Sequence, residues 1–144
     1  MVITRPTKID TFMMLAGVWA ERSTCSSRIS VGAVLVNKHF QVIASGYNGS
    51  PKGLPHCNSV GCIKDSDGHC VSAVHAEENA ILQCAANGVQ SRGTVIFVTH
   101  LPCDRCAMRI IQAGIVAVFY KDVYGDVSKT RNILNYAKIK LFKV

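Results

Sequence analysis

Acidic residues are scarce in this chain: nine Asp and Glu stand against sixteen Lys and Arg, and only three of the nine are glutamates. The resulting formal charge of +7 indicates an anionic partner. The basic residues are scattered, however, with a mild concentration from Lys121 to Lys143. Scattered charge fits a small phosphorylated ligand as well as it fits nucleic acid.

Long apolar runs are also missing, since none reaches the roughly 18 residues needed to span a bilayer. We therefore expect no membrane partner. The first ten residues, MVITRPTKID, lack the apolar core and small-residue cleavage site of a signal peptide. This indicates a cytoplasmic protein, in the host cytoplasm if the chain is viral. Neither a repeat nor a composition shift divides the sequence, which predicts a single domain over residues 1–144.

Apolar periodicity predicts four helices and five strands. The predicted helices cover residues 8–23, 75–88, 103–114 and 129–137, and the predicted strands cover residues 31–36, 41–48, 94–99, 115–120 and 139–142. Residues 49–71, rich in Gly, Pro, Ser, Cys and His, predict a long ordered loop, which in a compact domain is usually functional. The order predicts an α/β fold in which helices cover both faces of a five-stranded sheet.

Seven cysteines are present. In a chain without an export signal they indicate metal binding or catalysis rather than disulfides. Two motifs stand at predicted helix starts, H-x-E at His75 to Glu77 and P-C-x-x-C at Pro102 to Cys106. Chance gives about 0.3 C-x-x-C motifs in a chain of this composition but only about 0.001 for the whole combination.

These residues have the chemistry of a catalytic zinc site. Cys103 and Cys106 lie one helical turn apart on the same face, and His75 supplies a third ligand. Three protein ligands leave the fourth position to a water molecule, whose pKa zinc lowers to about 7. Glu77 is not needed as a ligand, so it is free to take the proton of the water and pass it to a substrate nitrogen. The alternative is a solvated Glu77, a core histidine and two buried thiols.

H-x-E followed by P-C-x-x-C is the signature of zinc nucleobase deaminases. With RSTCSSRISVGAVLV, SGYNGSPKGLPHC, DGHCVSAVHAEENA and THLPCDRCAMRIIQAGI, the chain resembles the deoxycytidylate (dCMP) deaminases, including bacterial late-competence and viral members, from about Cys25 to Tyr124. The resemblance implies a three-layer α/β/α cytidine deaminase-like fold with a mixed sheet. It implies hydrolysis of dCMP, and of dCTP as a further substrate, to feed thymidylate synthesis. It also implies a homo-oligomer, a hexamer or a dimer, with dCTP and dTTP as effectors and Mg²⁺ accompanying a triphosphate.

Carried over from that family, His75, Cys103 and Cys106 match the zinc ligands, Glu77 matches the proton shuttle, and Asn48 matches the asparagine that holds the sugar. The alternative for Asn48 is that it is an ordinary turn residue. Further substrate contacts are expected from residues chosen by charge and position: Arg28, Ser50 and Lys52 for the 5′-phosphate, and Tyr120 and Tyr124 for the base. A plain surface role for the first three and a core role for the tyrosines stay open.

Four further cysteines lie in the long loop or at element ends. A second, structural zinc bound by Cys25, Cys57, Cys62 and Cys70 would fix that loop, with His69 as the first substitute for Cys62 and His56 as the second. Some dCMP deaminases have such a site, with cysteines that match Cys25 and Cys57. Free buried thiols are the alternative.

Two other functions compete with nucleotide deamination. A nucleic-acid-editing deaminase, acting on tRNA adenosine or on cytidine, would explain the positive charge. It would need a continuous basic face and aromatic platforms, however, whereas aromatics make up only 7% of the chain, so we expect no nucleic-acid partner. A zinc-stabilised binding module would gain nothing from a carboxylate at position 77.

Overall fold

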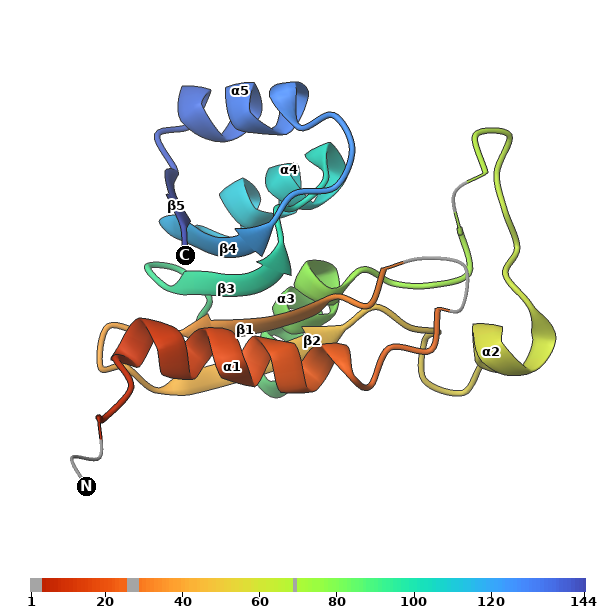
Figure 1. Cartoon of the computed structure of the whole chain (residues 1–144), viewed down its shortest axis with the longest axis horizontal. Coiled ribbons are helices and arrows are strands. Elements are labelled where there is room, and N and C mark those ends of the chain that lie inside the picture. Colours follow the sequence, from red (N-terminus) through yellow and green to blue (C-terminus); the bar gives the residue numbers. More distant parts are fainter. Residues whose placement is uncertain (1–3, 26–28, 69) are drawn as a thin grey trace.

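The computed structural model describes residues 4–25, 29–68 and 70–144. The elements follow the order predicted from the sequence (Figure 1): α1 (Lys8–Ala20), β1 (Gly32–Val36), β2 (Val42–Tyr47), α2 (Cys57–Val60), α3 (Ala76–Asn87), β3 (Val95–His100), α4 (Asp104–Gln112), β4 (Ala117–Asp122), α5 (Ser128–Tyr136) and β5 (Lys140–Lys143).

The five strands form one mixed sheet in the order β2-β1-β3-β4-β5. β1 pairs antiparallel with both β2 and β3, whereas β3, β4 and β5 run parallel. The carboxyl ends of β3 and β4 therefore meet at one edge, where open α/β sheets place their sites. The predicted α/β class and mixed sheet are confirmed.

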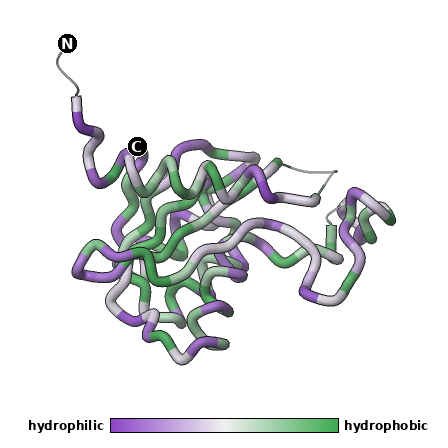
Figure 2. Tube along the Cα trace, turned by 90° about the horizontal axis from the view of Figure 1, so that it is seen from below, coloured by the Kyte–Doolittle hydropathy of each residue, from purple (hydrophilic) through white to green (hydrophobic). Residues whose placement is uncertain are grey.

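Helices cover both faces of the sheet, as predicted. α1 packs on one face through a core cluster that joins Phe12 and Ala16 to Val34, Val36 and Phe97. On the other face, α3, α4 and α5 pack through a larger cluster, with Ala80, Ile110 and Leu134 as fully buried contributors. Figure 2 shows the hydrophobic segments running through the middle of this body.

Local sequence fixes the start of α1 and the end of α3. Thr7 and Asp10 form a capping box in which each side chain accepts a hydrogen bond from the backbone of the other. α3 ends at Gly88, whose left-handed φ of 66° suits glycine. None of the helices in the described part of the chain is long and apolar enough to cross a membrane.

The segment predicted as a long loop contains a short helix that the sequence did not reveal. α2 spans Cys57–Val60, and Figures 1 and 2 show the segment around it projecting from the main body. Isolated bridges join Gly49 to Val74 and Lys64 to Cys70. Gly49 follows the end of β2, and Val74 is the residue before His75. The first bridge therefore ties this segment to the candidate site.

Candidate active site

His75, Cys103 and Cys106 come together at the starts of two helices. His75 is the N-cap of α3 and Cys103 is the N-cap of α4, while Cys106 lies in the first turn of α4. The Nδ1 atom of His75 is 3.6 Å from the Sγ of Cys103 and 3.5 Å from the Sγ of Cys106. All three ligand atoms lie within 4.8 Å of one another.

These distances fit a zinc ion. With Zn–S bonds of about 2.3 Å and Zn–N bonds of about 2.0–2.1 Å, a tetrahedral site separates nitrogen from sulfur by about 3.6 Å. One imidazole and two thiolates are a donor set found at catalytic zinc, where three protein ligands leave one position open. The donor set and its spacing therefore suit the metal that the motif predicts.

Glu77 lies in the first turn of α3, two residues after His75, and only 4% of it is exposed. Burial raises the pKa of its carboxyl group to about 7, against opposing effects of hydrogen bonding to its own backbone and of the charge of His75. A carboxyl group that titrates near neutral pH is suited both to accept and to release a proton.

The two thiols differ strongly in acidity. Hydrogen bonding from Cys106, opposed by burial and aided by His75, lowers the pKa of Cys103 to about 4. The pKa of Cys106 is raised by its hydrogen bond with Cys103, by burial and by the nearby charge of Glu77. The lowered pKa favours the thiolate form of Cys103, the form in which cysteine binds metal.

A cavity of about 390 Å³ opens onto this cluster. Its lining includes His75, Glu77 and Cys103, Asn48 at one side, and Tyr124 beyond the end of β4. Across it, Lys129 at the start of α5 pairs with Asp104 at a distance of 2.5 Å. His100, Asp104, Lys129 and Thr130 also line the cavity and were not predicted from the sequence. His100 and Asp104 could have been expected there, because they flank or lie within the P-C-x-x-C motif.

Asn48 is 7% exposed, and its side chain holds the backbone before β1. Its Oδ1 accepts a hydrogen bond from the Val31 amide at 2.7 Å, and its Nδ2 donates to the Ile29 carbonyl at 3.0 Å. Each of these atoms can make one more hydrogen bond. Asn48 therefore has a structural task and still lines the cavity.

Three of the expected substrate contacts are not among the residues that line this cavity. Tyr120 is 3% exposed and belongs to the core, and its hydroxyl accepts a hydrogen bond from Arg131. Ser50 and Lys52 line a second hollow of about 420 Å³, beside the stacked rings of Trp19 and Tyr47. Arg28 and His69 lie outside the described residues.

A second group of thiols is formed by Cys25, Cys57, Cys62 and Cys70, whose sulfur atoms lie within 4.8 Å of one another. Cys25 and Cys62 are 3.9 Å apart, and Cys57 and Cys70 are 3.8 Å apart. Tetrahedral zinc with four Zn–S bonds of about 2.3 Å requires sulfur atoms about 3.8 Å apart. His56 is not in the group; its ring faces the hydroxyl of Thr24 at 3.3 Å.

Residues 6–122 match the family model for the cytidine and deoxycytidylate deaminase zinc-binding region. The chain belongs to this deaminase family. Among curated relatives, it is 50% identical to ComE operon protein 2 of Bacillus subtilis over 133 residues, which are 92% of this chain and 69% of that protein. It is 37% identical to the deoxycytidylate deaminase of Saccharomyces cerevisiae over 142 residues, but these cover 95% of this chain and only 45% of the yeast protein.

A solved structure of this deaminase family extends the likeness to the fold. The dCMP deaminase of cyanophage S-TIM5, crystallised in complex with dCMP and dUMP, superposes with a TM-score of 0.83 at 28% identity. The superposition covers 99% of this chain and 100% of the phage chain. The cytidine deaminase-like fold that the resemblance implied is therefore confirmed.

Proposed function

We propose that the protein hydrolyses dCMP to dUMP and ammonia, and that dCTP is a further substrate. The observation that carries this proposal is the buried Glu77 beside His75, Cys103 and Cys106 at the floor of a cavity. The likeness to curated deoxycytidylate deaminases and to a structure bound to dCMP and dUMP supports this choice of substrate.

Each residue has a distinct task in the proposed reaction. His75, Cys103 and Cys106 hold the zinc ion, which when bound supplies an activated water. Glu77 would take one proton from the water and give it to the ring nitrogen next to C4, and then move the second proton to the amino group, which leaves as ammonia. Its burial keeps bulk water from competing for that proton.

The cavity residues support the orientation of the nucleotide. We propose that Asn48 binds the sugar, because its Oδ1 and Nδ2 can each make one more hydrogen bond. Tyr124 would form one wall of the site for the base. Arg28 stays a proposed phosphate contact, on its charge and its place next to Ile29, which lines the cavity. Tyr120, Ser50 and Lys52 are not included.

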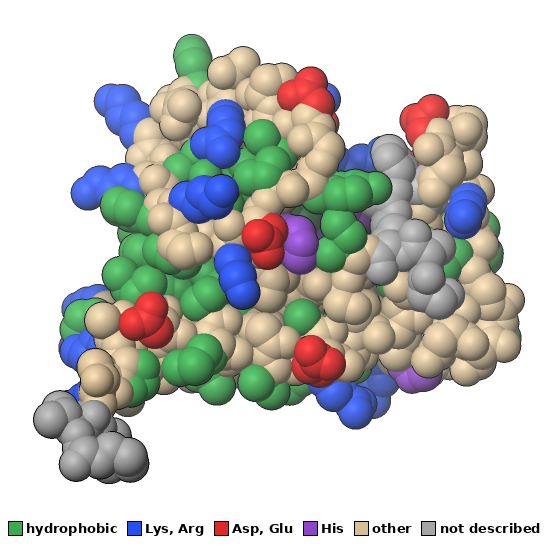
Figure 3. Space-filling view, in the orientation of Figure 1, with side chains coloured by type: hydrophobic (Ala, Val, Ile, Leu, Met, Phe, Trp, Pro, Cys, Tyr) green, Lys and Arg blue, Asp and Glu red, His purple; other side chains and the backbone are tan. Residues whose placement is uncertain are grey.

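Turnover of dCMP, dCTP, deoxycytidine and a tRNA anticodon stem by the zinc-loaded chain tests the proposal. We expect dCMP to be the best substrate, with deoxycytidine poorer because its phosphate is missing. Efficient action on the tRNA, with a steep loss of binding in salt, would favour the editing alternative. On the face in Figure 3 the Lys and Arg side chains are interspersed with apolar and acidic ones, which does not suggest a nucleic-acid track.

We propose a second, structural zinc bound by Cys25, Cys57, Cys62 and Cys70. The support is the closed set of four thiols and the match between their spacing and tetrahedral zinc. A site without an open position has no catalytic role of its own, so its task is to hold the segment around α2.

The remaining proposals rest on membership of the family. We propose a homo-oligomer regulated by dCTP and dTTP, with Mg²⁺ bound to the triphosphate; the hollow beside Tyr47 and Lys52 offers an aromatic ring and a cation for an effector. Light scattering and dCMP saturation curves with each triphosphate test these points. We also propose a cytoplasmic location, in the host cytoplasm if the chain is viral, because no disulfide joins the seven cysteines.

A further inference from the structure

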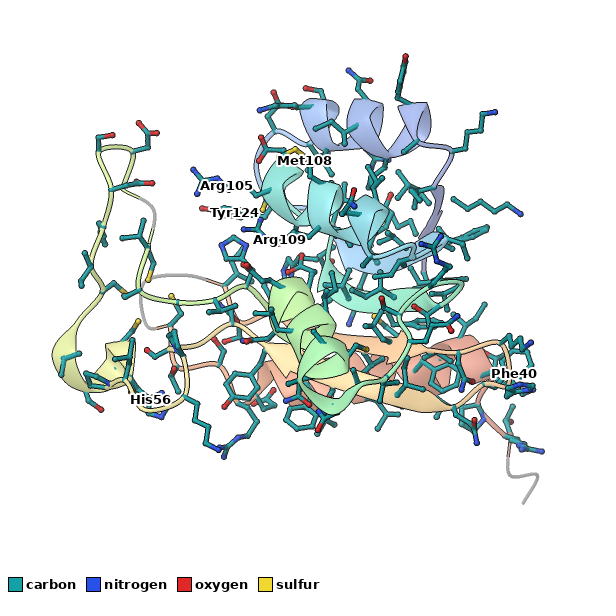
Figure 4. The ribbon with its side chains drawn as sticks, turned by 180° about the vertical axis from the view of Figure 1, so that it is seen from behind. Phe40, His56, Arg105, Met108, Arg109 and Tyr124 are labelled. Atoms are coloured by element: carbon teal, nitrogen blue, oxygen red, sulfur yellow. The ribbon has the colours of Figure 1, made fainter. Side chains whose placement is uncertain are left out.

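An ion pair joins the two helices that supply the proposed zinc ligands. Glu78 on α3 and Arg109 on α4 are 2.9 Å apart, measured from Oε1 to Nε. The Nη1 atom of Arg109 also donates a hydrogen bond to the Arg105 carbonyl oxygen at 3.1 Å. The guanidinium is therefore held by two acceptors, one on each helix. Figure 4 shows Arg109 extending from α4 near the start of α3.

The position of this pair relates it directly to the metal ligands. Glu78 follows Glu77 in the first turn of α3, and Arg109 lies three residues after Cys106, on the same side of α4. Ala76, Ala80 and Ala107 are buried on these helices together with the larger Ile110. The contacts of Arg109 with Glu78 and with the Arg105 carbonyl add a polar constraint on the relative position of the two helices.

Arg109 also neutralises the carboxylate of Glu78, which follows the buried Glu77 in the first turn of α3. The side chains of Arg109 and Glu78 are 43% and 27% exposed, so the pair contributes little to overall stability.

We propose that Arg109, held by Glu78, is a positioning residue for the zinc site: it fixes Cys106 relative to His75. The inference rests on the zinc site of the proposed function. Residues that orient metal ligands typically change metal affinity by about 10–100-fold when they are replaced. We therefore expect an effect on metal binding that is large compared with the effect on folding.

The test compares four variants of the full chain: Arg109→Gln, Arg109→Lys, the double variant Glu78→Gln/Arg109→Gln, and Arg105→Gln as the control. Arg105 lies one turn earlier on α4 and forms no ion pair with a residue that the structure describes. Cadmium NMR follows the metal, because an ion bound by two thiolates and an imidazole resonates apart from one bound by four thiolates. Competition of zinc with a chelator gives the affinity, and thermal unfolding reports the fold.

We expect Arg109→Gln to weaken metal binding at His75, Cys103 and Cys106 by about 10-fold or more. Arg109→Lys should lose less, because it keeps the charge but not the fork. The double variant should lose about as much affinity as Arg109→Gln alone, because the contact between the two helices is absent from both. Arg105→Gln should match the parent.

Two results would overturn the inference while leaving the proposed function intact. One is zinc affinity of Arg109→Gln within twofold of a parent that binds zinc at this site. The other is an equal loss in Arg105→Gln, which would indicate a general effect of charge. A parent chain that binds no metal at His75, Cys103 and Cys106 would instead refute the proposed function, and the inference with it.

Discussion

Gly46 in β2 lies directly against Ala76 at the start of α3. A Cβ atom at position 46 would be 2.4 Å from the Ala76 carbonyl oxygen and 2.7 Å from the Ala80 amide nitrogen. Only a residue without a side chain allows this approach. α3 is thereby seated on the sheet with His75 and Glu77 at the cavity, so the absence of a side chain at position 46 helps to place the site.

We predict that Gly46→Ala destabilises the fold by about 3 kcal/mol or more, at or above the upper end of ordinary overpacking, because the obstructing atoms belong to the backbone and cannot rotate away. Denaturant unfolding of the zinc-loaded protein measures the change. Gly17→Ala is the matched control. Gly17 lies inside α1 with nothing within 4 Å of an added Cβ, so alanine should stabilise the helix by about 1 kcal/mol. Equal stability of the two variants would contradict the prediction.

Replacement of Glu77 by glutamine should abolish deamination and leave zinc bound. The amide keeps the shape of the buried side chain but cannot accept a proton. Turnover of dCMP and the zinc content of the same preparation are the two measurements. General acid/base catalysis contributes about 10²–10⁴-fold, so a variant that kept more than about a tenth of the parent rate would assign the proton transfer elsewhere.

Cys103→Ser should lose both metal and activity at the catalytic site. A serine hydroxyl is not ionised at neutral pH, and the thiolate that the raised acidity of Cys103 provides would be gone. Added zinc should not restore turnover in this variant. In the parent, by contrast, removal of the metal with a chelator should be reversed by zinc. Full zinc content together with full turnover in Cys103→Ser would refute the ligand assignment.

The strands, the longer helices and the zinc cluster could be predicted because each leaves a local pattern. Strands show short apolar runs, helices show a 3.6-residue repeat, and the ligands follow metal-binding spacing. α2 could not be predicted, since four residues do not establish a period. Lys129 and Thr130 were missed for a different reason. They reach the cavity only because β4 pairs with β3 and thereby brings the start of α5 to this edge of the sheet, which no local pattern reveals.

The two tyrosines illustrate the same limit within five residues. The sequence places Tyr120 at the end of a strand over 115–120, at the active edge. β4 in fact continues to Asp122, which leaves Tyr120 inside the strand and facing the core, and puts Tyr124 beyond the edge with 66% exposed. The predicted strand ends two residues too early, so the sequence did not show that Tyr120 lies within β4.

These positions predict opposite effects of two substitutions. Tyr124→Ala should raise the KM for dCMP without changing the unfolding temperature, because Tyr124 lines the cavity but is largely exposed. Tyr120→Phe should leave the KM unchanged and cost about 1 kcal/mol of stability through the lost hydrogen bond with Arg131. Steady-state kinetics and thermal unfolding of both variants check the pair. A raised KM in Tyr120→Phe alone would reverse the assignment.

Cys57→Ser should lower the zinc content from two ions per chain to one, and it should act on the substrate site only indirectly. The amide of Asn58, next to Cys57, donates to the Thr24 carbonyl beside Cys25.

The Ser23 hydroxyl in turn donates to the carbonyl of Asn48 at 3.0 Å. Loss of the structural metal should therefore loosen the segment that carries Asn48, lower the unfolding temperature and raise the KM for dCMP, while the zinc held by His75, Cys103 and Cys106 remains. Cys84→Ala is the control, since Cys84 is buried in α3 and lies outside both thiol groups. One zinc ion per chain in the parent, with Cys57→Ser as stable as the parent, would show that the four cysteines are free thiols packed together.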